Sequence, residues 1–416
     1  MSDEMSHRST AIAPKKIRVI SAVGPGDVVG AFRDWKEGTR TVSETSITFS
    51  SQEFEFFEKH RVAFWVVSSH SRRESLSDGP NRIENRPRVT TKPVAGVAFH
   101  LVQVLYALSL LNSAIRFRAT HAIIDSGTTQ WFALCLFRLF NIVVVPNFHN
   151  ACWSLADRSS SVSQRALSWL DGIFFKYCVR SALGVSPDGV RQVRLVSAGN
   201  TKFFEYRAQF VRSDFGELPR AKMSMPVRIM FAGRVEEEKG VFDVVRISEL
   251  LSVRHPNRFV FDICGTGGAF DLLAAEIAAR EISDFVILHG KLNRPDLLKV
   301  YGRSHLVIVP TRSSSSEGLP MICAEAVIAG RPVITSRVSN SLEVLRGAVI
   351  EARADDSLDY ANKIELLADD PQAYAELVCN TWSVSMQFTN PDFGLTHVLE
   401  QCLLHAAPRG INRNDV

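Results

Sequence analysis

The chain has 416 residues, of which 46% are hydrophobic and 22% are charged. This length favours two domains over one, and the composition excludes a chain that is disordered throughout. The net charge of +4 conceals an asymmetry, because residues 1–210 hold 26 Lys and Arg against 17 Asp and Glu, whereas residues 211–416 hold 22 against 27. The basic first half suggests an anionic partner or a membrane surface, with ordinary solvated charge as the alternative.

The first elements in the chain are a polar tail and a buried strand. Residues 1–14 are polar and of mixed charge, and we expect them to be disordered. The segment "KIRVISAV" (16–23) predicts a strand that ends in the glycine loop "GPGDVVG" (24–30). No apolar stretch follows Met1, and the seven Cys residues form no C-x-x-C pair. We therefore expect free thiols in the cytoplasm, not disulfides or a zinc site.

A long apolar helix and a βαβ unit come next. The segment 97–117 predicts a helix, and because His100, Gln103 and Asn112 interrupt it, a core or interfacial helix is favoured over a membrane span. The segment 120–149 predicts a strand, a loop, a helix and a strand, which is the order of a βαβ unit. A parallel α/β architecture is therefore expected.

A second series of alternating strands and helices follows the polar stretch 212–225. Strands are predicted within the segments 226–240, 258–267, 284–292, 305–311 and 331–336, with helices between them. The closing segment 392–407 predicts an amphipathic helix. We therefore predict an α/β protein with two Rossmann-like domains, residues 15–212 and 213–390, and a last helix within 391–416 that crosses back to the first domain.

The start of the apolar helix near Pro320 is the first candidate site. Proline suits the first helical turn because its missing N–H would have no partner there. The neighbouring amides then lack intrahelical partners and form an anion site. These amides belong to Gly318, Leu319, Met321 and Ile322.

Two glutamates flank this site. The helix is apolar on all sides to about Ala329 except at Glu325, and a buried carboxylate needs hydrogen-bond donors such as an Arg fork or the two hydroxyls of a ribose. Glu317, in the loop before the helix, can reach hydroxyls farther along such a ligand. The alternatives are a structural salt bridge for Glu325 and a helix-charge interaction for Glu317.

Two cations follow the first strand of the same predicted domain. Arg234 and Lys239 lie in "FAGRVEEEKG", at the carboxyl end of a strand, where open α/β sheets bind ligands. Together they could face the helix amides across one diphosphate. Solvated side chains beside Glu236, Glu237 and Glu238 are the alternative.

Several familiar motifs are missing. Neither "GTGGAF" (265–270) nor "GPGDVVG" completes G-x-G-x-x-G, and no G-x-x-x-x-G-K-[ST] occurs. These gaps argue against dinucleotide redox chemistry and P-loop chemistry. The sequence also has no Asp-x-Asp, so a metal-bound diphosphate has no obvious ligands, and we expect no metal and no resident cofactor.

The motifs resemble those of retaining glycosyltransferases of the GT-B fold, in the large family 4. The resemblance covers residues 226–380 and includes G-R-x4-K-G at 233–240, "CGTG" at 264–267, "LHGKL" at 288–292 and E-G-L-P-x4-E-A at 317–326. The E-x7-E spacing between Glu317 and Glu325 is its most specific feature. It implies two Rossmann-like domains that face each other across a donor-binding cleft.

The resemblance also implies roles for residues of the second half. Glu325 would bind the nucleotide ribose, Glu317 would hold the donor sugar, and Arg234 and Lys239 would grip the diphosphate. The other donor-binding residues would be Gly318, Leu319, Pro320, Met321, Gly265, Gly290, Lys291 and Leu292, the last three near the base.

In the first half the likeness is looser. Gly26 lies in a loop expected near donor and acceptor, and His149 lies at a strand end, where a histidine of such enzymes contacts the donor sugar. A satisfied loop histidine is the alternative for His149. The segment after residue 336 lacks the family's Gly-Gly-x-x-Glu turn, so we leave Glu343 out of the site.

The resulting prediction is a metal-independent retaining glycosyltransferase with a nucleotide diphosphate sugar as co-substrate. It would move a hexose to an acceptor hydroxyl, with a lipid-linked saccharide for a surface polysaccharide or exopolysaccharide as the expected acceptor. We expect a cytoplasmic enzyme, with a peripheral position on the inner face of the plasma membrane as a hypothesis, and no nucleic-acid partner. The alternatives are a sugar-nucleotide epimerase or hydrolase, and a catalytically silent membrane-associated binding subunit.

Overall fold

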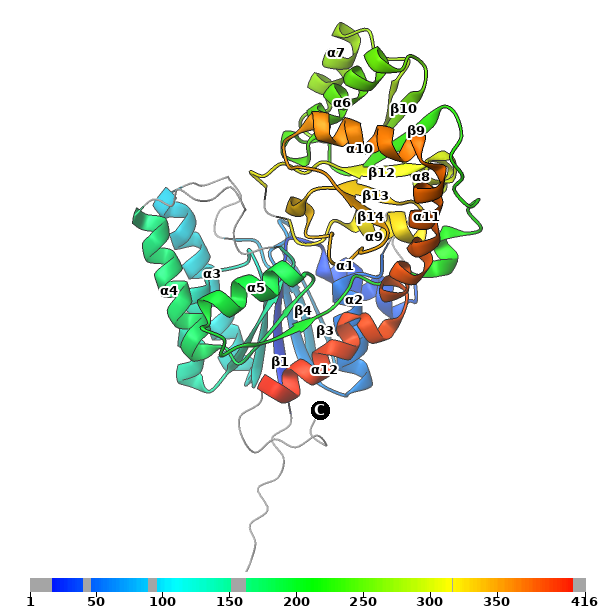
Figure 1. The fold of residues 1–416 in the computed structure, drawn as a ribbon. Helices are drawn as coiled ribbons and strands as arrows, with labels where there is room; N and C mark the ends of the chain where they lie inside the picture. Colours follow the sequence, from blue (N-terminus) through cyan, green and yellow to red (C-terminus); the bar gives the residue numbers. More distant parts are fainter. Residues whose placement is uncertain (1–16, 40–45, 89–95, 151–161, 316, 407–416) are drawn as a thin grey trace, which may run out of the picture.

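The computed structural model describes residues 17–39, 46–88, 96–150, 162–315 and 317–406. The predicted tail, residues 1–14, lies outside the described residues. The chain forms two α/β domains, each built on its own sheet (Figure 1).

The first domain contains an eight-stranded sheet in the order β3-β4-β2-β1-β5-β6-β7-β8. Neighbouring strands are parallel except β3 and β4, which form an antiparallel hairpin at one edge. The strands are β1 (Arg18–Val23), β2 (Ala63–Ser68), β3 (Glu74–Asp78), β4 (Asn81–Asn85), β5 (His121–Asp125), β6 (Val143–Phe148), β7 (Ser181–Gly184) and β8 (Lys202–Glu205).

Helices cover both faces of this sheet and bury its apolar side chains in two clusters. One face packs against α1 (Val28–Lys36), α2 (Phe49–Lys59) and α12 (Leu395–Ala406). The other face packs against α3 (Gly96–Phe117), η1 (Trp131–Phe140), α4 (Val162–Cys178) and α5 (Pro187–Val196). The helix predicted within 120–149 is present as η1, a 3-10 helix of ten residues.

The second domain contains a six-stranded parallel sheet in the order β11-β10-β9-β12-β13-β14. Its strands are β9 (Val227–Ala232), β10 (Phe259–Cys264), β11 (Val286–Gly290), β12 (Leu306–Val309), β13 (Val333–Thr335) and β14 (Val349–Glu351). Its helices are η3 (Glu237–Lys239), α6 (Val241–Arg254), α7 (Phe270–Ala279), α8 (Arg294–Arg303), α9 (Met321–Ile328), η4 (Arg337–Ser339), α10 (Ser357–Asp369) and α11 (Pro371–Ser385). The predicted architecture of two α/β domains with parallel sheets is confirmed.

The chain crosses between the domains twice, and the two crossing segments lie side by side. Tyr206 belongs to the core of the first domain, whereas Phe210 belongs to a core of the second. The return crossing runs through η5 (Met386–Phe388) and η6 (Pro391–Phe393) to α12. The amides of Arg207 and Phe210 donate to the carbonyls of Phe393 and Phe388, over 2.7 and 2.8 Å. These bonds join the crossing segments into one connection.

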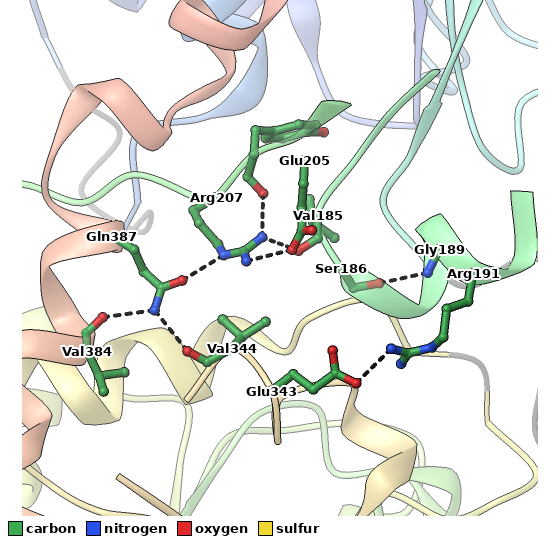
Figure 2. Close-up of polar contacts among 11 residues, drawn as sticks. Val185, Ser186, Gly189, Arg191, Glu205, Arg207, Glu343, Val344, Val384 and Gln387 are labelled. Carbon is green, nitrogen blue, oxygen red and sulfur yellow. Dashed lines mark hydrogen bonds and ion pairs between the residues drawn. The ribbon is translucent and has the colours of Figure 1, made fainter. Parts of the chain in front are cut away.

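Polar side chains add two links beside this connection (Figure 2). Arg207 Nε donates to Gln387 Oε1 over 2.8 Å, and the Gln387 amide donates to the carbonyl of Val344 over 2.9 Å. Arg191 on α5 pairs with Glu343 over 2.7 Å, but both side chains are about half exposed, so this ion pair contributes little stability. Glu343 therefore lies at a contact between the domains.

Candidate active site

A cavity of about 410 Å³ opens between the two domains. The first domain contributes Phe49, His149, Asn150 and Val185 to its lining, and the second contributes the ends of β9 and β12 and the start of α9. The carboxyl ends of parallel strands meet here, which is where open α/β sheets bind ligands. The volume and the position suit a small molecule held between two domains.

Lys239 and Glu317 form an ion pair within this cavity. The Lys239 ammonium donates to Glu317 Oε1, and the two side chains are 21% and 10% exposed. Lys239 ends η3 and is followed by Gly240 in the left-handed conformation (φ 75°), which turns the chain into α6. A cation and a carboxylate that are separated by 78 positions in the sequence therefore meet at the carboxyl ends of the strands of the second sheet.

Arg234 lines the same cavity but is more open to solvent. It comes after β9 and Gly233, its side chain is 67% exposed, and it pairs with the Glu238 carboxylate at 3.5 Å. A pair this exposed holds the guanidinium weakly. Arg234 is therefore able to turn toward an anion in the cavity at little energetic cost.

The start of α9 forms another wall of the cavity. Leu319, Pro320 and Met321 line it, and none of the side chains that the structure describes caps the helix. Pro320 has an extended backbone (ψ 129°), so the helix begins at Met321, one residue later than predicted. The positive end of the α9 dipole thus faces the cavity that contains Lys239 and Arg234.

Glu325 lies deeper in the same helix. Ala324 lines the cavity, whereas Glu325 is not among the lining residues and is buried. Its Oε2 accepts a hydrogen bond from the Tyr301 hydroxyl over 3.0 Å. Burial and the adjacent Glu325 carboxylate raise the pKa of Tyr301 well above its ordinary value, so this hydroxyl keeps its proton and donates. The ribose-binding role of Glu325 stays a prediction.

Gly265 and Gly290 bring strand ends of the second sheet close together. The Gly265 amide donates to the Gly290 carbonyl over 2.8 Å, and a Cβ on Gly265 would lie 1.8 Å from the carbonyl oxygen of Gly233. Only glycine permits this approach at φ 139°. These two residues, with Lys291 and Leu292, do not line the 410 Å³ cavity. Their contact with a base stays a prediction.

Gly318 lies at one of the contacts between the two domains. It forms an antiparallel bridge with Asn150, and a Cβ there would lie 1.7 Å from the His149 carbonyl oxygen. Asn340 Nδ2 also donates to the Glu317 carbonyl over 2.6 Å, which holds this loop in place. The loop before α9 is therefore fixed against the end of β6.

His149 faces the cavity from the end of β6 and pairs with a buried aspartate. His149 Nε2 lies 2.9 Å from Asp125 Oδ2, and the imidazole ring packs on Phe49 with 4.8 Å between ring centroids. Burial lowers the pKa of His149, but the charge and hydrogen bond of Asp125 together outweigh burial and leave this pKa above its ordinary value. Asp125 therefore favours the protonated form of the His149 ring.

Further polar groups support this pair. Asn147 Nδ2 donates to Asp125 Oδ1 over 2.8 Å, and the Tyr206 hydroxyl donates to Asn147 Oδ1 over 2.7 Å. Glu53 on α2 is fully buried and accepts from the Ser21 hydroxyl over 2.8 Å. Burial, together with the charge of Asp125, raises the pKa of Glu53 to about 8.

The raised pKa of Glu53 predicts a pH-dependent stability. The unfolded chain ionises this carboxyl from about pH 4.5, whereas the folded protein keeps the proton until about pH 8. Rising pH between these values therefore favours the unfolded state. We expect the native protein to lose at least about 1.4 kcal/mol more unfolding free energy from pH 5 to pH 8.5 than Glu53→Gln does, which corresponds to one pKa unit. Urea unfolding at both pH values measures this difference.

The control for this experiment is Glu55→Gln, an exposed glutamate on the same helix. It should follow the pH dependence of the native protein. A Glu53→Gln variant that also follows the native protein would show that Glu53 ionises normally in the folded state.

The sequence analysis missed Asp125, Glu53 and Tyr206. Asp125 is the last residue of β5, and its place at a strand end is the signal that could have identified it. Glu53 and Tyr206 have no comparable signal, because their burial results from packing between segments far apart in the chain.

Comparison with known proteins identifies the second domain. Residues 219–381 match the family of glycosyl transferases group 1. D-inositol 3-phosphate glycosyltransferase from Arthrobacter sp. is 29% identical over 170 residues, which is 38% of this chain and 39% of that protein. Amylovoran biosynthesis glycosyltransferase AmsK from Erwinia amylovora is 25% identical over 129 residues, 30% of this chain and 31% of that protein. The matched segments thus span less than half of each relative.

Solved structures resemble nearly the whole chain. Sucrose-phosphate synthase from Thermosynechococcus elongatus has a TM-score of 0.70 at 13% identity, covering 94% of this chain and 98% of that chain. HepE from Anabaena, in complex with UDP and glucose, has a TM-score of 0.60 at 13% identity, covering 92% and 98%. The chain therefore has the GT-B fold, and the domain formed by residues 219–381 belongs to the glycosyl transferases group 1 family.

Proposed function

We propose that the protein is a retaining glycosyltransferase that moves a hexose from a nucleotide diphosphate sugar to an acceptor hydroxyl. The carrying observation is the cavity between the domains, where Lys239, Arg234 and the start of α9 converge. The family of the second domain supports a sugar-transfer reaction, and HepE, which shares the fold, was solved with UDP and glucose.

The charges of this cavity suit a diphosphate leaving group. As the bond from the sugar to the diphosphate breaks, negative charge grows on the phosphate oxygens. Lys239, Arg234 and the dipole of α9 would stabilise that charge where it develops, without a metal ion. Glu317, which Lys239 positions, would accept hydrogen bonds from hydroxyls of the donor sugar.

Retention of configuration needs no side chain as general base in this proposal. The leaving phosphate would take the proton of the acceptor hydroxyl on the same face of the sugar ring. His149, at the end of β6, would contact the donor sugar from the first domain. Nuclear magnetic resonance tests this retention, because the coupling of the anomeric proton should indicate the same configuration in the glycoside product as in the donor sugar.

A panel of UDP-, GDP-, ADP- and TDP-sugars tests the function itself. The correct donor should raise the melting temperature and should be consumed when an acceptor is present. Consumption at the same rate without any acceptor would indicate a hydrolase or an epimerase. A raised melting temperature without consumption would indicate a silent binding subunit.

A surface of the first domain formed by α3, η1 and α4 exposes large apolar side chains. Within the described residues, α3 is the one helix that is long and apolar enough to span a membrane, and 39% of its most apolar window is buried. Large apolar side chains on it are exposed: Val97, Phe99, Leu101, Leu105, Leu108 and Ile115. The helix packs beside η1, which exposes Leu136, Leu139 and Phe140, and η1 packs on α4, which exposes Trp169 and Tyr177.

Charge supports a membrane as the partner of this face. The charged residues of α3, η1 and α4 are Arg116, Arg138, Arg165, Lys176 and Asp171, four basic against one acidic. An apolar face with basic residues suits the surface of an anionic membrane. We therefore propose a peripheral membrane enzyme whose acceptor is a lipid-linked saccharide for polysaccharide synthesis. The name of the Erwinia relative, which concerns amylovoran biosynthesis, is consistent with this acceptor class.

Vesicle flotation tests the membrane proposal. The native protein should float with vesicles that contain 30% phosphatidylglycerol at low salt. The triple variant Leu101→Glu, Leu105→Glu, Leu108→Glu, on one face of α3, should float at least about 10-fold less because charges now meet the bilayer.

The control carries Leu358→Glu and Leu366→Glu, two exposed leucines of α10 in the second domain, and should float like the native protein. Failure of the native protein to float with anionic vesicles would overturn the membrane proposal while leaving the donor chemistry intact.

A further inference from the structure

A second cavity of about 210 Å³ lies in the first domain beside the one already described. The loop between β1 and α1, including Gly26, forms one side of it. The start of α2 and the ends of β5 and β6 form the rest. Phe49 and His149 line both cavities, so the two spaces meet at these side chains.

The two cavities differ in charge. The first contains the cations Arg234 and Lys239 and one carboxylate, Glu317, which pairs with Lys239. The second contains three carboxyl groups, from Asp27, Glu53 and Asp125, and its described lining residues include no Lys or Arg. The basic group among these described lining residues is the His149 ring, which pairs with Asp125 at 2.9 Å.

The carboxyl groups of the second cavity are held by the fold and remain able to accept hydrogen bonds. Asp27 caps α1 by accepting from the Gly30 amide, and its Oδ1 also accepts from Asn85. Glu53 and Asp125 are both buried, where electrostatic effects are stronger than in water. A phosphate group would meet the Asp27 carboxylate here and no Lys or Arg among the described lining residues, whereas sugar hydroxyls would find acceptors.

We propose that this second cavity binds the acceptor, and that the part of the acceptor entering it is an uncharged, hydroxyl-rich ring and not a phosphorylated one. This inference rests on the proposed function and specifies its substrate class. Because the cavities meet at His149, a hydroxyl of such a ring would lie next to the sugar of a donor in the first cavity. A lipid-linked saccharide fits if its phosphate stays outside and only its terminal sugar enters.

The raised pKa of Glu53 fits this arrangement. A carboxyl that keeps its proton near neutral pH can donate one hydrogen bond as well as accept, which an ionised carboxylate cannot do. Sugar hydroxyls both donate and accept, so a protonated Glu53 beside the carboxyl oxygens of Asp125 offers them both kinds of partner.

Matched pairs of acceptors test the charge class. The pairs are glucose and glucose 6-phosphate, n-octyl glucoside and its 6-phosphate, and myo-inositol and myo-inositol 1-phosphate, each with the donor found in the sugar-nucleotide panel. We expect the best neutral compound to be used with at least a 10-fold higher kcat/KM than its phosphorylated partner. Equal use of both members, use of no neutral member, or preference for the phosphorylated member would overturn the inference.

The variant Asp27→Asn tests whether the charge of one carboxylate in the cavity sets this preference. Asparagine caps helices as well as aspartate does, so the fold should persist while one negative charge leaves the cavity. The ratio of kcat/KM for the neutral acceptor to kcat/KM for its phosphorylated partner should then fall about 3-fold or more, since one repulsive charge is gone. Glu55→Gln removes an exposed charge from α2, outside the cavity, and should leave the preference unchanged. An unchanged preference in Asp27→Asn would also count against the inference.

The donor measurements separate this inference from the proposed function. If no sugar nucleotide raises the melting temperature or is consumed, the proposed function fails. If the donor binds and is consumed but phosphorylated acceptors are preferred, only the inference about the acceptor fails.

Discussion

Replacing Lys239 by alanine is expected to lower kcat/KM for sugar transfer about 10²–10³-fold, or about 2.7–4 kcal/mol of barrier, by analogy with the loss of one donor from an oxyanion hole. The reason is that Lys239 is the less exposed of the two cations in the donor cavity and its ammonium is fixed by Glu317. A fixed charge needs no reorganisation when the diphosphate leaves. Steady-state kinetics with the identified donor measures the effect.

A loss of kcat/KM in Lys239→Ala supports the role of Lys239 only if the variant is correctly folded. Lys239→Ala leaves Glu317 without its cation, but the Glu317 side chain keeps 10% exposure and can accept water, so we expect the circular dichroism spectrum to be unchanged. Lys299→Ala is the matched control, because its side chain on α8 is 76% exposed and outside the cavity. A Lys239→Ala enzyme as fast as this control would refute the role of Lys239 in the reaction.

Gly318→Ala is expected to reduce transfer at least about 100-fold, the loss typical of a misplacement of about 1 Å at a reacting centre. The new methyl group would lie 1.7 Å from the His149 carbonyl oxygen and 3.2 Å from the Asn150 Cα. Both neighbours are backbone, so the domains must separate or the loop before α9 must shift. Either change moves Glu317 and the start of α9 away from the first domain.

The control for Gly318→Ala is Gly172→Ala in α4, where a Cβ meets no atom within 4 Å. Alanine is the better helix former, so this variant should keep full activity and gain slightly in stability. If Gly318→Ala also keeps full activity, the contact between Gly318 and His149 does not define the reactive arrangement.

The strands of the second domain could be predicted because their sequences are continuous apolar runs. β9, β10 and β12 are buried almost throughout, and such runs bounded by glycine, proline or polar turns indicate parallel strands. The hairpin of β3 and β4 was not predicted, because "ESLSD" and "NRIEN" are polar and lie at the exposed edge of the sheet. η1 was read as an ordinary helix, since its apolar composition does not distinguish a 3-10 helix from an α-helix.

The residues of the candidate site also fall into two groups, those that the sequence could predict and those that it could not. Arg234, Lys239 and Glu317 could be found because they lie beside turns and helix starts whose residue types are recognisable in the sequence. The prediction could not show that Lys239 would pair with Glu317, since that contact depends on how two loops meet. Glu53 sits in a helix that also has exposed glutamates at positions 55 and 58, both after it, and nothing local distinguishes it from them.

The position of α12 has a consequence for the order in which the protein forms during synthesis. Leu395, Leu399 and Leu403 are part of the first domain's core, although they follow the whole second domain in the chain. Part of one sheet face of the first domain therefore stays uncovered until the second domain and α12 have been synthesised. The second domain is contiguous and can mature first, which reverses the usual amino-terminal priority of folding on the ribosome.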